Sequence, residues 1–298
     1  MRTQMKRRQR NRRIAVAASL LVVFALIGVV VYMATLAGQG SQLDSWVNQP
    51  VSTSDMAGLQ AASLQPFGPS PTSAMQSAVH LSGGSSWNTA KPQVVYVGAE
   101  FCTYCALQRW ALVMALSRFG DFSGLRYMTS GPNEGDLATF TFVGSTYSSS
   151  YITFKPYELA DRSNPPRQLQ TLPSNYSAIW NAYGGYPFMD FGNRYLVPGS
   201  LLVDESILQG KNWTSVILSI STSDGGGTQV RQAANLVTAV ICKLTQGAPA
   251  SVCLASPIDS TSTGIAGPVG GAQSSRGLPA FPAAPSPDRV IQPKHRGH

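Results

Sequence analysis

Beyond its first 13 residues the sequence lacks any sizeable excess of basic side chains. Those 13 residues, MRTQMKRRQRNRR, hold seven of the 22 lysines and arginines and no acidic residue. The rest of the chain carries 15 basic against 14 acidic side chains, so the net charge of +8 lies almost wholly at the N-terminus. Proteins that bind nucleic acid through its phosphates need a basic face. The sequence leaves no such face, and we expect no nucleic-acid partner.

The chain is also poor in the ligands that zinc prefers. A structural zinc site takes four cysteine or histidine ligands, commonly in two close pairs. The sequence has four cysteines and three histidines, and two of the histidines, His295 and His298, lie in the last four residues. Cys242 and Cys253 have ten residues between them and do not form a close pair. A zinc-binding module is therefore the weakest interpretation, and we expect no metal and no other cofactor.

A long uncharged segment follows the basic N-terminus. Residues 14–36, IAVAASLLVVFALIGVVVYMATL, contain no charged side chain over 23 positions. A helix of this length spans roughly 34 Å, more than the about 30 Å of a bilayer's hydrocarbon core. We therefore expect a single-pass anchor in the lipid bilayer of the cell membrane, with residues 1–13 as a basic cytoplasmic tail and the C-terminal domain extracytoplasmic. A cleaved secretory signal, with its usual apolar core of about 7–15 residues, is the competing interpretation and gives the same compartment.

Composition divides the remaining chain into three parts. Residues 37–75 are rich in Gly, Ser, Gln and Pro, which predicts a flexible linker. Residues 257–298 have a similar composition without a period, which predicts a disordered tail. Residues 76–256 lie between them and are long enough to form one domain.

Strand-like and helix-like segments alternate within this domain. A β-branched run at Gln93–Gly98 predicts a buried strand. A strongly apolar segment then predicts a buried helix that begins near the cysteines and stops at Gly120. This order predicts an α/β fold with a central mixed sheet flanked by helices. The later elements are expected as a strand at 125–130, paired strands at 138–144 and 150–159, a helix at 172–184, a hairpin with Gly192-Asn193 at its turn, and a closing helix at 228–246.

Two cysteines three positions apart, Cys102 and Cys105, stand where the chain passes from the expected strand to the expected helix. At a helix N-terminus, free N–H groups and the helix dipole favour a thiolate and lower the pKa of a cysteine. Cys102 is therefore the expected attacking residue and Cys105 the resolving one. A structural disulfide is the alternative, although so short a ring restrains little of the unfolded chain.

The stretch QVVYVGAEFCTYCALQRWALVMALSRFG resembles the first strand and active-site helix of the thioredoxin superfamily. The later stretch GYPFMDFGN is similar to that superfamily's strand that begins with a cis-proline. The resemblance implies a thioredoxin-like sandwich over residues 76–256. It also implies that Pro187, after Tyr186, is the cis-proline beside the cysteine pair, with Pro198 as the second choice.

A narrower resemblance concerns three separated stretches: the cysteine helix, TFTFVGSTYSSSYITF and ICKLTQGAPASVC. Together they are similar to an uncharacterised family of membrane-anchored, prokaryotic thioredoxin-like proteins that carry a domain of unknown function. That family implies a fold more than a reaction. The sequence has neither Gly-Pro nor Pro-His between its two cysteines, so the direction of electron flow stays open.

Four residues near the pair are candidate modulators of its chemistry: Glu100, Thr103, Tyr104 and Arg109. Glu100 is suited to proton transfer and Arg109 to stabilising a thiolate. For both charged residues the competing interpretation, which we prefer, is a solvated surface side chain. Trp110 follows on a mostly apolar helix, where core packing is expected.

Cys242 and Cys253 flank a turn after the last expected helix. We expect a structural disulfide here, which stabilises the fold by on the order of 3 kcal/mol in the entropic model. A pair that exchanges with Cys102 and Cys105 is the alternative.

Two functions remain. The first is a membrane-anchored thiol–disulfide oxidoreductase that acts on protein thiols and disulfides and is recycled by a quinone-linked membrane partner. The second is a tethered binding or scaffold module with a thioredoxin-like fold, in which both disulfides are structural.

Overall fold

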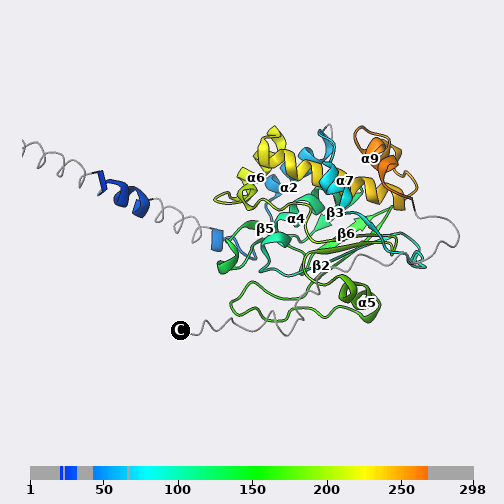
Figure 1. Cartoon of the computed structure of the whole chain (residues 1–298), viewed down its shortest axis with the longest axis horizontal. Helices are drawn as coiled ribbons and strands as arrows, with labels where there is room; N and C mark the ends of the chain where they lie inside the picture. Colours follow the sequence, from blue (N-terminus) through cyan, green and yellow to red (C-terminus); the bar gives the residue numbers. More distant parts are fainter. Residues whose placement is uncertain (1–20, 23, 32–42, 66–67, 268–298) are drawn as a thin grey trace, which may run out of the picture. The chain divides into compact units, whose positions relative to one another are not determined.

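The computed structural model describes residues 21–22, 24–31, 43–65 and 68–267 in two units, Met1–Ser45 and Trp46–His298 (Figure 1). In the first unit, the described residues between 21 and 31 are helical and exposed. No helix among the described residues is long and apolar enough to cross a membrane. The basic tail at 1–13 and more than half of the expected anchor at 14–36 lie outside the described residues.

The second unit is built on a five-stranded mixed sheet with the order β1-β9-β8-β2-β7. Strand β2 (Gln93–Gly98) lies next to the edge strand β7 (Thr153–Glu158), with which it pairs in parallel, and it pairs antiparallel with β8 (Phe188–Phe191). Strand β9 (Tyr195–Pro198) pairs with β8, and β1 (His80–Leu81) completes the edge. Five of the six residues of β2 are buried, as its β-branched sequence predicts.

The predicted hairpin with Gly192-Asn193 at its turn is confirmed. Both turn residues have positive φ, 68° at Gly192 and 57° at Asn193. Two consecutive positive φ angles are typical of the type I′ turn, whose twist matches that of the flanking strands. The Asn193 N–H also donates to Asp190 Oδ1 at 2.7 Å, which holds the turn against the end of β8.

Helices cover both faces of the sheet (Figure 1). On one face α4 (Thr103–Leu116) packs against α7 (Gly225–Leu244), and of the 14 residues of α4 only Tyr104 is not buried. On the other face α5 (Ser174–Tyr183) places Trp180 against Val95 and Val97 of β2. The second unit is thus a mixed α/β structure with a central mixed sheet flanked by helices. The remaining helices are α2 (Thr53–Leu64), α3 (Ser73–Ser77), α6 (Trp213–Thr222), α8 (Ala250–Cys253) and α9 (Ile258–Gly264).

Two ribbons outside the sheet differ from the sequence prediction. Strand β4 (Arg126–Thr129) pairs with β5 (Ala138–Thr141), and β3 (Gly120–Ser123) pairs with β6 (Thr146–Ser149). The expected pairing of 138–144 with 150–159 is therefore wrong. The Ser/Gly-rich stretch between them is not a simple turn, because it contains β6 itself.

Gly120 also has a different role from the expected helix stop. Helix α4 ends at Leu116, and Gly120 is the first residue of β3. A Cβ atom at Gly120 would lie 2.1 Å from the Ser148 carbonyl oxygen, so glycine is needed for β3 and β6 to approach.

Two boundaries predicted from composition are also wrong. Residues 53–64 of the expected linker form α2, whose Leu59 and Ala62 are buried. The expected tail begins too early, because α9 is ordered and buries Ile258. A few apolar residues are enough to pack a short helix against an existing core. The average composition of a mostly polar segment does not reveal them. Residues 268–298 of the tail lie outside the described residues.

The turn between α6 and α7 generates a testable prediction. A Cβ atom at Gly227, in the first turn of α7, would lie 2.0 Å from the Ser219 carbonyl oxygen. We expect Gly227→Ala to lower the free energy of unfolding by about 2–3 kcal/mol, because backbone must move to admit the methyl group. Urea unfolding of the full chain measures this change.

Gly225 is the matched control, because no atom lies within 4 Å of a Cβ built there. Gly225→Ala is expected to leave stability unchanged or to raise it by up to about 1 kcal/mol, since alanine favours the helix. Equal stability changes in the two variants would contradict this account of the turn.

Candidate functional site

Cys102 and Cys105 lie where β2 passes into α4. Cys102 is the N-cap residue of α4, with extended backbone, and its Sγ accepts the N–H of Cys105 at 3.2 Å. Both cysteines are free thiols. Cys102 is 8% exposed, whereas Cys105 is completely buried. Both cysteines are thus buried, and only Cys102 keeps a small exposed fraction.

The two thiols differ in acidity. A hydrogen bond from the Cys105 thiol lowers the pKa of Cys102, with further help from the Cys105 N–H and from Arg109, and these effects outweigh the opposing effect of burial. Burial raises the pKa of Cys105 well above its usual value. This asymmetry suits Cys102 as the nucleophile and Cys105 as the residue that acts second.

A buried ion pair, Arg109 with Glu158, lies next to the backbone that carries the cysteines. Arg109 donates from Nε and Nη2 to the two carboxylate oxygens of Glu158, at 2.9 and 2.7 Å, and both side chains are completely buried. Arg109 Nη2 also donates to the carbonyl oxygen of Ala99 at 2.8 Å, and Ala99 packs against both cysteines. The preferred interpretation of Arg109 as a surface side chain is thus wrong.

Two residues of β2, Tyr96 and Gly98, shape the surroundings of this ion pair. The Arg109 guanidinium lies 6.0 Å from the centre of the Tyr96 ring, a cation–π contact. A Cβ atom at Gly98 would lie 2.2 Å from the Tyr96 hydroxyl, so glycine leaves the room that this ring occupies. Burial raises the pKa of Tyr96 well above its usual value, so the phenol is neutral beside the ion pair.

Glu100 is also buried, with 6% of its surface exposed, so its interpretation as a surface residue is wrong as well. Its Oε1 accepts the Thr141 hydroxyl at 2.5 Å, and its N–H donates to the Ala160 carbonyl at 2.8 Å. Burial raises the pKa of this carboxyl group. These contacts attach Glu100 to β5 and to the loop after β7, and no described hydrogen bond joins it to either cysteine.

The two residues between the cysteines have opposite environments. Thr103 is buried, and its hydroxyl donates to the carbonyl oxygen of Glu134 at 2.7 Å and lies 2.9 Å from Glu134 Oε2. Tyr104 is 44% exposed beside the pair. Trp110, as expected, is a core residue, and its Nε1 donates to the Ala138 carbonyl at 2.9 Å.

An aromatic rim packs against the cysteines. Phe101 and Tyr186 contact the cluster of Ala99 and both cysteines, and their rings meet edge to face with centres 6.3 Å apart. Tyr186 precedes Pro187 through a cis peptide bond, whereas the bond before Pro198 is not cis. The structure therefore brings the Tyr186-Pro187 segment to the cysteine pair.

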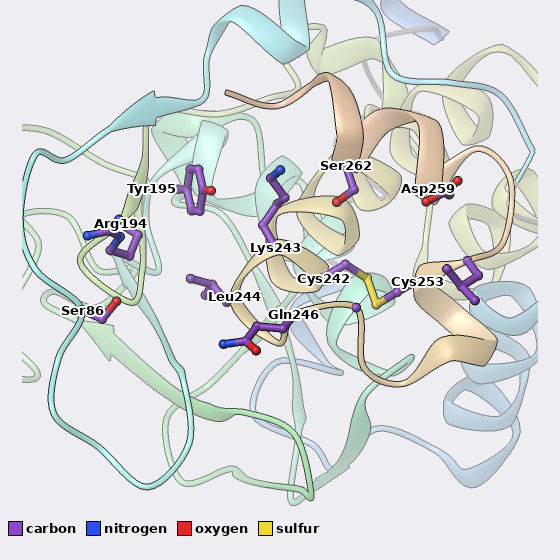
Figure 2. A pocket seen from close by; sticks show the side chains of 12 residues that line it. Ser86, Arg194, Tyr195, Cys242, Lys243, Leu244, Gln246, Cys253, Asp259 and Ser262 are labelled. Atoms are coloured by element: carbon purple, nitrogen blue, oxygen red, sulfur yellow. A yellow bond between two sulfur atoms is a disulfide. The ribbon is translucent and has the colours of Figure 1, made fainter. Parts of the chain in front are cut away.

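Cys242 and Cys253 form a disulfide, with their Cα atoms 5.5 Å apart. Figure 2 shows this disulfide on the wall of an open hollow of about 670 Å³, between the end of α7, α9 and the β8–β9 hairpin. The polar side chains that line the hollow are Ser86, Arg194, Tyr195, Lys243, Gln246, Asp259 and Ser262.

The disulfide lies at the opposite end of the sheet from Cys102. A Cβ atom at Gly192 would lie 3.1 Å from Leu244 Cδ2, and the Gly192 N–H donates to the carbonyl of Gln93, the first residue of β2. Cys102 lies four residues after Gly98, the last residue of this strand. At about 3.3 Å per residue, the strand and its loop separate the two pairs by roughly 20 Å. This arrangement counts against direct exchange between the pairs.

Comparison with known proteins identifies a domain but no activity. A family model described as a domain of unknown function (DUF929) matches residues 78–185, the stretch from β1 through the cysteine helix to α5. No curated protein and no solved structure matches the chain. The sequence resemblance implied such a domain, and the match leaves the function to the chemistry of the site. Within the described residues, no group of three or more His, Cys, Asp or Glu side chains is placed to hold a metal ion.

The Arg109–Glu158 pair was missed at the sequence level, and it yields a prediction. Arg109→Met leaves the Glu158 carboxylate buried without its partner. We expect this variant to lose about 3–5 kcal/mol of unfolding free energy, whereas Arg109→Met combined with Glu158→Met recovers most of that loss. Urea unfolding of the reduced full chain measures both variants.

Arg167→Met is the matched control. Arg167 pairs with Asp161 at 2.9 Å, but its side chain is 79% exposed, so its loss should be less than about 1 kcal/mol. If the double variant is no more stable than the single Arg109 variant, the unpaired charge of Glu158 does not cause the loss of unfolding free energy.

Proposed function

We propose that the chain is a membrane-anchored, extracytoplasmic thiol–disulfide oxidoreductase that acts on protein substrates through Cys102 and Cys105. The observation that carries the proposal is the asymmetry of the pair. Cys102 caps a helix, accepts hydrogen bonds at its sulfur and keeps a small exposed fraction, whereas Cys105 is completely buried. A structural disulfide needs no such difference between its two cysteines.

The order of elements supports a thioredoxin-like sandwich as the frame of this site. Strand β2 leads into the cysteine helix α4, and β7 lies parallel beside β2. The β8–β9 hairpin starts just after Pro187, and the long helix α7 follows it and packs against α4. The two ribbons β3–β6 and β4–β5 are then an insertion between the cysteine helix and β7.

The proposed reaction moves two electrons from the reduced pair to a substrate disulfide. The Cys102 thiolate attacks one substrate sulfur, the substrate S–S bond breaks, and the first substrate thiolate leaves and takes a proton from water. Cys105 then loses its proton to water and attacks Cys102 Sγ. The Cys102–Cys105 bond forms as the mixed disulfide breaks and the second substrate thiol leaves. The reverse sequence oxidises a substrate dithiol.

The proposed location follows from the N-terminal sequence. The basic residues 1–13 and the uncharged residues 14–36 support a single pass with the N-terminus in the cytoplasm. A membrane protein linked to quinones is then the proposed partner that restores the redox state of the pair. The rival proposal is a tethered scaffold module, which the low exposure of Cys102 favours.

Trapping of mixed disulfides tests the proposal. In Cys105→Ser the resolving thiol is absent, so substrate proteins should stay attached to Cys102 and appear as bands that a reductant releases. Cys102→Ser is the matched control, because it keeps the Cys105 thiol but lacks the attacking one. It should trap nothing and should lose insulin-reduction activity by about 100-fold or more. A scaffold would give no trapped species and no cysteine-dependent rate.

A further inference from the structure

The residues on either side of Cys102 are both held by one turn, residues 130–137. On one side the Gly131 N–H donates to the Phe101 carbonyl at 2.8 Å. On the other side the Thr103 hydroxyl bonds to Glu134, through both its carbonyl and its carboxylate oxygen. The Ser130 hydroxyl donates to the same Glu134 carbonyl at 2.8 Å, which fixes the shape of the turn. The turn therefore places a carboxylate beside the start of α4.

Glu134 carries the unbalanced charge of this region. Two loops border the pair, residues 131–137 and 160–167, and they contain three acidic and two basic side chains. Arg162 pairs with Asp136 at 2.7 Å, and Arg167 pairs with Asp161 at 2.9 Å. Among the described ion pairs none involves Glu134, which is an exposed residue. The buried Arg109 and Glu158 cancel each other, and Glu100 is buried with a raised pKa. The two loops therefore leave one net negative charge beside the start of α4, on Glu134.

We infer that Glu134 is a specificity-determining residue and Thr103 its positioning residue, so that Cys102 reacts faster with neutral and cationic partner segments than with anionic ones. This inference rests on the proposed function, since it concerns the partner that meets Cys102. Thr103 follows Cys102 directly, which places the carboxylate within about 10 Å of the sulfur.

The expected size of the effect follows from Coulomb's law. At this separation in water, one negative charge raises the encounter rate of a partner with two positive charges by a few-fold. It lowers the encounter rate of a partner with two negative charges by a similar factor. Salt screens the interaction, because the Debye length is about 30 Å at 0.01 M ionic strength and about 3 Å at 1 M. The preference for cations should therefore be about three- to tenfold at low ionic strength and should disappear at high ionic strength.

Three small disulfides of different charge provide the test: cystamine, which is cationic, hydroxyethyl disulfide, which is neutral, and oxidised glutathione, which is anionic. Each reacts once with the full chain carrying Cys105→Ser, with the Cys102 thiol free and the Cys242–Cys253 disulfide intact, forming a Cys102–S–S–R bond and releasing one RS⁻. Mass spectrometry of the intact protein gives the three rate constants. Any change in the thiolate fraction of Cys102 affects all three alike, so the cystamine-to-glutathione ratio isolates the charge of the partner.

Adding Glu134→Gln should lower the cystamine-to-glutathione ratio by about three- to tenfold at 0.01 M ionic strength. Thr103→Val should move the ratio part of the way, because it removes the hydroxyl that holds the carboxylate, and Thr103→Ser should restore it. Asp259→Asn is the matched control, since it removes a charge near the distant disulfide and should leave the ratio unchanged. Thermal unfolding checks that each variant is folded.

The outcomes separate this inference from the proposed function. A ratio unchanged within twofold in Glu134→Gln overturns the inference, even where mixed disulfides with proteins are trapped. A shifted ratio without trapped proteins supports the role of Glu134 and counts against protein substrates. No reaction of Cys102 with any of the three disulfides overturns both.

Discussion

The hydrogen bonds that Cys102 Sγ receives from Cys105 are the interaction on which the site depends. They exist because Cys102 ends an extended segment and caps α4, which points both the thiol and the N–H of Cys105 back toward the first sulfur. They favour the thiolate at Cys102, and burial keeps the Cys105 thiol protonated. The nearly complete burial of α4 fixes this geometry, and Arg109 and Glu158 supply the paired charges that such burial requires.

The two cysteine pairs lie at opposite ends of the sheet. At the C-terminal end of β2 lie the cysteine pair, the aromatic rim of Phe101 and Tyr186, and the turn that carries Glu134. At the opposite end lies the disulfide of Cys242 and Cys253 beside the polar hollow. This separation favours a structural role for the second pair, which ties the end of α7 to the segment before α9. The proposed redox exchange then belongs to the first pair.

Local signals in the sequence predicted strand β2 and the β8–β9 hairpin. Contacts between residues far apart in the chain could not be predicted from such signals. The β-branched run of β2 and the Gly192-Asn193 turn are recognisable because neighbouring residues decide their conformation. The Arg109–Glu158 pair joins residues 49 positions apart, and Thr103 meets Glu134 across 31 positions, so neither contact leaves a pattern in the chain. One signal was present: an arginine within an otherwise apolar, buried helix implies a buried acidic partner.

The reduction potential of the Cys102–Cys105 pair tests the central claim most directly. The full chain, with the Cys242–Cys253 disulfide intact, is brought to equilibrium with dithiol buffers, and the reduced fraction of the first pair is measured by mass spectrometry after alkylation. Because the stabilised Cys102 thiolate favours the reduced form, the account predicts a potential above about −300 mV, in the range of exchange-active pairs. A potential below about −300 mV would identify an inert structural bond and contradict the account.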